Sequence, residues 1–156
     1  MKIDPDDTLA TLTVSSALEK IELLSHQSLS STGAWQPYAI LTHCAQSVEC
    51  SMLGYPIQQH ELYKATIGKL AFSIFSTIGY MKHPLDEPIP GAPELDANGR
   101  LEKVLERLKN AYINFEQYTG PLAPHFTYGE LSKEDYTRAH VMHLNNHLEE
   151  IREYLT

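Results

Sequence analysis

The sequence has few of the residues that form cross-links or bind polyanions. Only two cysteines occur in 156 residues, and their spacing, Cys44 to Cys50, fits neither a CxxC redox motif nor a zinc knuckle. We therefore expect reduced thiols and a cytoplasmic protein. The twelve Lys and Arg residues are scattered along a chain of net charge −8. Phosphate binding needs clustered basic side chains, so we expect no nucleic acid partner.

Long hydrophobic runs are also absent. The longest apolar-rich stretch, residues 67–78, is too short to span a bilayer and contains Lys69, so we expect no membrane partner. Residues 1–7 are acidic, which argues against a secretory signal. The sequence has no G-x-S-x-G elbow, Gly-rich phosphate loop or H-E-x-x-H motif. It therefore lacks the commonest sequence motifs of hydrolases and nucleotide-binding proteins.

Apolar residues recur at helical spacing along most of the chain and predict an all-α fold in a single domain, residues 1–156. The first helix is expected to start at residues 4–7, and residues 28–33 to form a loop. Four proline residues exclude a helix from residues 82–93 and predict a long, stiff connection. The remaining helices are expected over residues 35–54, 59–78, 97–119 and 132–154. With no strand signal, these helices imply an antiparallel bundle.

Three histidines near the C-terminus, His140, His143 and His147, lie at offsets of three and four and share one helical face. Imidazole is a common ligand of zinc, nickel and iron, and a pair four apart can grip one ion. His43, in the middle of an apolar helix, is the best third ligand. His140 is an alternative ligand or a group that orients one. The competing interpretation makes each of them a core histidine satisfied by a hydrogen bond.

The other histidines and aromatic residues carry weaker signals. His125 lies in the loop before the last helix, where it either bonds a turn or edges a pocket. His83 precedes Pro84, which favours extended backbone and a structural role. His26 and His60 fall at helix ends, where capping or solvent exposure explains them. Trp35 could line a pocket beside the second helix, although aromatics at helix ends more often edge the core.

With these residues in view, the chain resembles the DinB/YfiT-like superfamily, and within it a bacterial branch catalogued as a domain of unknown function. The resemblance covers most of the chain in order. It rests on four stretches: Trp35 through Leu41-Thr-His-Cys-Ala45 to Tyr55-Pro56, then His83-Pro84 to Gly91, then His125-Phe-Thr-Tyr-Gly129 to Ser132, and last His140-Val-Met-His143-Leu-Asn-Asn-His147.

The resemblance implies an antiparallel four-helix bundle of DinB type, with the helix over about residues 59–78 as an addition. It also implies a homodimer and a divalent metal (Zn, Ni or Fe) held by His43, His143 and His147. Relatives of this kind include transferases and isomerases that use low-molecular-weight thiols. The proline-rich loop and the loop that contains His125 and Tyr128 would wall the pocket of an unidentified small-molecule substrate.

The first functional hypothesis is therefore a metal-dependent enzyme, such as a thiol S-transferase, with a metal-dependent hydrolase as a variant of it. A second hypothesis is a non-catalytic metal-binding or stress-response interaction protein. A third is a metal-free helical dimer whose histidines belong to the core. An open coordination position beside a pocket favours the first hypothesis, and a closed position favours the second.

Overall fold

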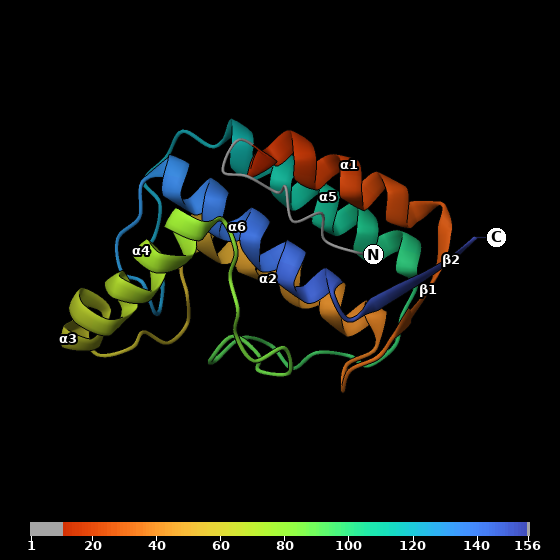
Figure 1. The fold of residues 1–156 in the computed structure, drawn as a ribbon, viewed down its shortest axis with the longest axis horizontal. Coiled ribbons are helices and arrows are strands. Elements are labelled where there is room, and N and C mark those ends of the chain that lie inside the picture. Colours follow the sequence, from red (N-terminus) through yellow and green to blue (C-terminus); the bar gives the residue numbers. More distant parts are fainter. Residues whose placement is uncertain (1–10, 156) are drawn as a thin grey trace.

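The computed structural model describes residues 11–155, and most of them form helices (Figure 1). The four long helices are α1 (Val14–Ser25), α2 (Pro37–Leu53), α5 (Leu101–Gln117) and α6 (Lys133–Leu148). Helix α1 packs on both α5 and α6, and so does α2, so the four helices enclose an apolar core. The mainly helical architecture confirms the expected all-α class.

Short local signals set where these helices begin. Pro37 occupies the first turn of α2. Backbone N–H groups there have no partner within the helix, so the missing N–H of proline costs no hydrogen bond. Ser132 caps α6, because its side chain accepts a hydrogen bond from the backbone N–H of Asp135 at 3.1 Å. The described part of α1 begins after Thr13, whose side chain accepts from the backbone N–H of Ser16 at 3.1 Å. The helix start expected at residues 4–7 lies outside the described residues.

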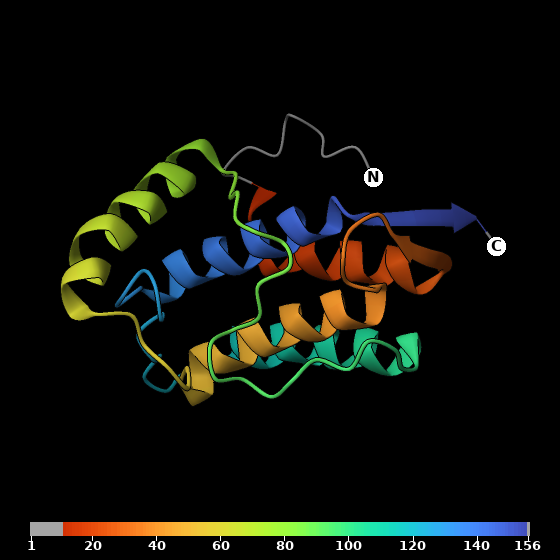
Figure 2. The ribbon, with the colours of Figure 1, turned by 90° about the horizontal axis from the view of Figure 1, so that it is seen from below.

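The additional helical segment, residues 61–78, stands across one end of the long helices (Figure 2). It consists of α3 (Glu61–Tyr63), a π-helical turn η2 (Lys64–Gly68) and α4 (Lys69–Ile78), and it ends at Gly79 in the left-handed conformation, with φ of 72°. Within α4 only Phe72 and Ser76 are buried. The opposite face is apolar and exposed, and it presents Leu62, Ile67, Leu70, Ile74 and Ile78.

A two-stranded antiparallel sheet joins β1 (Gln27–Ser31) to β2 (Ile151–Leu155), with Leu29 opposite Glu153. Two expectations were therefore wrong: residues 28–33 are not simply a loop, and the last helix ends at Leu148 rather than near residue 154. Ile151 continues the apolar spacing of α6 and is buried, but it reaches the core from a strand. Spacing alone cannot separate these two arrangements when the pairing partner is distant in sequence.

The connection over residues 79–100 forms neither helix nor strand, as the prolines predict for residues 82–93. The helix expected from residue 97 begins only at Leu101. The connection crosses the face on which α2 and α6 lie side by side (Figure 2). Its first residues are thereby brought next to the histidine-bearing segments of both helices. Within residues 11–155, no helix combines the length and apolar character that crossing a membrane requires.

Candidate metal centre

Two facing helices bring the three predicted ligand residues together. His43 lies in the middle of α2, while His143 and His147 lie one turn apart on α6. The Nε2 atom of His43 is 3.1 Å from that of His143, which in turn is 3.2 Å from Nε2 of His147. The i,i+4 spacing and the α2–α6 contact thus produce the expected convergence.

A fourth histidine, which we assigned only a structural role from the sequence, joins this group. His83 Nε2 lies 3.1 Å from His147 Nε2. His83 precedes Pro84 in the long connection, so its side chain comes from outside any helix or strand. Helical spacing cannot reveal such a partner. The one signal in the sequence was that the stiff loop containing His83-Pro84 was itself expected to help build a site.

The geometry of these four side chains, called the histidine cluster below, fits a metal ion. One ligand atom from each of His43, His83, His143 and His147 lies within 4.8 Å of all the others. Two nitrogens on a tetrahedral zinc, with Zn–N of about 2.0–2.1 Å, lie roughly 3.3 Å apart. The three contacts of 3.1–3.2 Å come close to this separation. The remaining pairs, which lie within 4.8 Å, would close toward this separation around one ion.

The cluster is also held in the protonation state that metals require. Burial, with a smaller contribution from His83, lowers the pKa of His43 to about 4. Burial likewise lowers the pKa of His147 to about 2, with His43 and His83 contributing. Burial lowers the pKa of His143 and of His83 as well. All four imidazoles are therefore neutral at pH 7, and each can offer a lone pair without first losing a proton.

Hydrogen bonding within the cluster cannot account for all three close contacts. Each Nε2 carries either a proton or a lone pair, so the three contacts can hold at most two well-formed N–H···N hydrogen bonds. The Nδ1 atoms of His43, His83 and His147 are buried and have no hydrogen-bond partner among the described residues. A metal ion would use all four Nε2 lone pairs at once. The rings are then oriented by packing rather than by the Nδ1 hydrogen bonds that commonly support ligand histidines.

Two neighbouring residues hold the cluster in place. The Trp35 ring is parallel to His147, with ring centroids 6.3 Å apart, and meets His43 edge-on at 5.3 Å. The buried Asn146 side chain accepts a hydrogen bond from the backbone N–H of His83 at 3.2 Å, which docks the long connection on α6. Trp35, expected as a possible pocket residue, contacts the cluster but is not among the residues that line the cavity described below. Asn146, between the two α6 histidines, was not predicted.

His140 does not belong to the cluster. Its Nε2 lies 3.0 Å from Ser51 Oγ, and Ser51 in turn donates to the carbonyl of Val48 at 2.6 Å. The Ser51 hydroxyl proton is therefore used in the bond to Val48, so His140 Nε2 must be the donor to Ser51 Oγ. Burial lowers the pKa of His140 to about 3, and its ring stacks on Tyr136. His140 is thus placed beside the cluster rather than as a fifth convergent nitrogen.

His125 fulfils both roles that the sequence left open. Its Nδ1 accepts hydrogen bonds from the backbone N–H groups of Thr127 and Tyr128, at 3.1 and 3.2 Å, and so stabilises a turn. Burial, with a smaller contribution from His140, lowers the pKa of His125 to about 3. A neutral ring whose Nδ1 accepts must carry its proton on Nε2. The ring also lines a cavity, which makes His125 a fixed hydrogen-bond donor beside it.

A cavity of about 370 Å³ lies against the histidine cluster and is lined by His43, His83 and His143. As expected, its walls include both loops. The proline-rich connection contributes Pro84, Pro88, Ile89 and Pro90, and the second loop contributes His125, Phe126, Thr127 and Tyr128. Helix α4 closes another side with Ala71 and Phe75. Its volume falls within the usual range of small-molecule sites.

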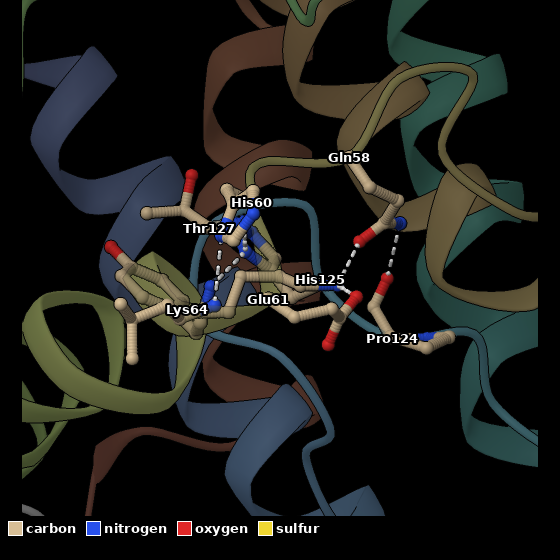
Figure 3. Close-up of polar contacts among 9 residues, drawn as sticks. Gln58, His60, Glu61, Lys64, Pro124, His125 and Thr127 are labelled. Atoms are coloured by element: carbon tan, nitrogen blue, oxygen red, sulfur yellow. Dashed lines mark hydrogen bonds and ion pairs between the residues drawn. The ribbon is translucent and has the colours of Figure 1, made fainter.

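The second loop is fastened to the additional helical segment (Figure 3). The Lys64 ammonium group is buried and contacts Glu61 at 2.6 Å and Gln58 Oε1 at 2.9 Å, while Gln58 donates to the carbonyl of Pro124 at 3.0 Å. Gly68 lies so close to the carbonyl of Thr127 that a side chain at this position would overlap it. The π-helical turn therefore fixes the wall that contains His125.

Fold and site together define a mainly helical protein in which two helices and a loop gather four neutral histidines beside a cavity. A model of the family described as "Protein of unknown function (DUF1569)" matches residues 6–154, so the chain belongs to this family. No curated protein and no solved structure matches the chain.

Proposed function

We propose that this protein binds a divalent metal ion through His43, His83, His143 and His147. The observation that carries the proposal is the convergence of four neutral Nε2 atoms with contacts of 3.1–3.2 Å. The limit of two hydrogen bonds within the cluster supports it, because a metal ion would account for all three close contacts at once. Histidine ligands suit Zn, Ni and Fe alike, so the proposal names a divalent ion rather than one element.

We also propose that α1, α2, α5 and α6 form a four-helix bundle of DinB type, to which residues 61–78 are an added segment. The arrangement of one ligand on the second long helix and two on the last, four residues apart, is what the resemblance implies. His83 is an addition to that three-histidine set. It supplies a ligand from a loop, which makes it the ligand best able to leave and open a position.

The cavity beside the cluster supports a metal-dependent enzyme, and a thiol S-transferase is the class that the resemblance favours. A divalent ion held there would lower the pKa of a thiol or a water that reached it. The protein's own contributions would be the shielding of that position from solvent by the two loops and a hydrogen bond from His125 Nε2 to the bound molecule.

One observation favours a second candidate, a non-catalytic metal-binding protein. Four histidine ligands can complete a tetrahedral sphere, which is the pattern of structural zinc sites, whereas catalytic sites commonly keep three protein ligands. The two candidates differ in whether His83 stays bound when a small molecule enters the cavity. Exchange of His83 for an added ligand supports the enzyme, and a sphere closed to added ligands supports the second candidate.

The test is metal content, measured by plasma mass spectrometry on untagged protein. The wild type should hold about one metal ion per chain, and the His143→Ala/His147→Ala variant should hold none. His26→Ala/His60→Ala is the matched control, because it also removes two histidines, both at helix ends and outside the cluster. Circular dichroism checks that each variant is folded. A wild type that takes up neither Zn²⁺ nor Ni²⁺ would refute the proposal.

A further inference from the structure

The cavity beside the histidine cluster is almost free of formal charge. Glu87 is the only Asp, Glu, Lys or Arg among the described residues that line it, and it is exposed. Two basic side chains of the neighbouring elements are engaged elsewhere: Lys64 pairs with Glu61, and Arg138 donates to Ser76. A ligand carboxylate or phosphate that does not itself bind the metal ion would therefore lose its hydration inside the cavity without gaining a cation from the side chains of the lining.

The walls instead offer apolar surface. Phe75, Phe126 and Tyr128 present aromatic rings, and Met81 and Ile89 are buried against the same space. The three prolines of the connection add rigid aliphatic surface. Such a lining favours a ligand with a ring or a branched hydrocarbon body, because burying apolar area is the main source of binding free energy that it can supply.

Uncharged polar groups also line the cavity, among them Ser47, Gln59 and Thr127. The histidine cluster faces the cavity through His43, His83 and His143, and His125 adds an N–H donor whose direction is fixed by the two backbone bonds to its Nδ1. A ligand that fits both features carries one metal-binding group with a hydrogen-bond acceptor next to it. The rest of the molecule meets a largely apolar lining.

We propose that the cavity takes a small molecule with one metal-binding end, an adjacent acceptor for His125 and an uncharged, largely apolar body, and that it disfavours ligands with a further carboxylate or phosphate. This inference rests on the proposed metal site and narrows its substrate class. A thiol that carries carboxylates would have to leave them outside the cavity, beside Glu87 and the neighbouring Asp86.

The test uses zinc-loaded protein and three hydroxamic acids with the same metal-binding end. Titration calorimetry with ZnCl2 first establishes loading, and the same method then compares acetohydroxamic, benzohydroxamic and 4-carboxybenzohydroxamic acid. The phenyl ring should strengthen binding about ten- to hundredfold over the methyl group. The added carboxylate should weaken binding at least about tenfold relative to benzohydroxamic acid.

A matched pair of variants tests the charge argument. Glu87→Gln removes the carboxylate at the cavity and should improve binding of the carboxylated probe about two- to fivefold relative to benzohydroxamic acid. Glu94→Gln alters an exposed carboxylate of the same connection that does not line the cavity, and it should change neither.

The outcomes separate this inference from the proposed function. If zinc loads and the carboxylated probe binds as tightly as benzohydroxamic acid, or if none of the probes binds, the ligand class is wrong while the metal site stands. If zinc does not load, the proposed function fails and the inference fails with it.

Discussion

Replacing His83 with alanine tests the one cluster member that the sequence did not predict. Its Nε2 contacts His147 Nε2 at 3.1 Å, and its backbone N–H is held by Asn146. The substitution removes one of four converging nitrogens and leaves His43, His143 and His147 on their helices. We expect the His83→Ala protein to fold and to bind zinc, but more weakly.

The magnitude follows from the free energy of zinc binding by four protein ligands. Structural sites bind zinc with about 10–16 kcal/mol at pH 7, or about 3 kcal/mol per ligand if the ligands share it evenly. Losing one ligand should therefore raise the Kd for zinc about a hundredfold or more. At a free zinc concentration that saturates the wild type, the variant should lose about 2.7 kcal/mol of zinc-linked stabilisation.

Two measurements check this expectation. Competition with a chromophoric chelator gives the Kd for zinc, and urea unfolding with and without buffered zinc gives the linked free energy of unfolding. His26→Ala serves as the control, because His26 ends α1 and its side chain is 72% exposed. His83→Ala protein with wild-type zinc affinity would refute the four-histidine set and restore the three ligands expected from the sequence. Wild-type affinity in His143→Ala as well would refute the metal site.

Four further predictions concern the surroundings of the cluster. Asn146→Ala should weaken zinc binding about tenfold in chelator competition, because it releases the loop that carries His83. Gly68→Ala should lower the free energy of unfolding in urea by about 1 kcal/mol, since overlap with the Thr127 carbonyl costs about 1–3 kcal/mol and outweighs a gain of about 1 kcal/mol in helix propensity. In EDTA, lowering the pH from 7 to 5 should cost about 2 kcal/mol of stability for each of His125 and His140. Their folded-state pKa values of about 3 lie below the unfolded value of 6.5, so only the unfolded chain takes up protons in that window. A His125→Gln/His140→Gln variant should lose that part of the pH dependence, as chemical denaturation at both pH values would reveal. If the exposed apolar face of α4 forms the expected homodimer, Leu70→Lys/Ile74→Lys should reduce the mass in light scattering to that of the 17.6 kDa chain.

Local patterns predicted what local interactions determine. The apolar spacing of α1, α2, α5 and α6 and the cap at Ser132 placed the long helices, and the i,i+4 pair placed His143 and His147 on one face. His43 could be chosen because it is a polar residue in the middle of an apolar helix. In each case the residues that form the pattern lie within one or two helical turns of one another, and so do the interactions that they make.

What the sequence did not reveal depends on contacts between distant segments. Strand β1 is rich in serine and gains its structure only by pairing with β2. His83 and His147 are 64 residues apart, and their contact depends on the course of the long connection and on Asn146. The helix expected over residues 59–78 was predicted correctly in type, but its π-helical turn reflects close packing against Thr127. Such arrangements follow from packing rather than from periodicity.

The cluster also bears on how the chain unfolds. An ion bound there would join α2, the long connection and α6 across sequence separations of 64 and 100 residues, in the manner of a cross-link that the two free cysteines do not provide. Only the pair on α6 is adjacent in an unfolded chain, so most of the binding energy arises after the three segments have met. Interactions that form after the folding transition state slow unfolding rather than speed folding. Metal supply would then set the lifetime of the folded protein.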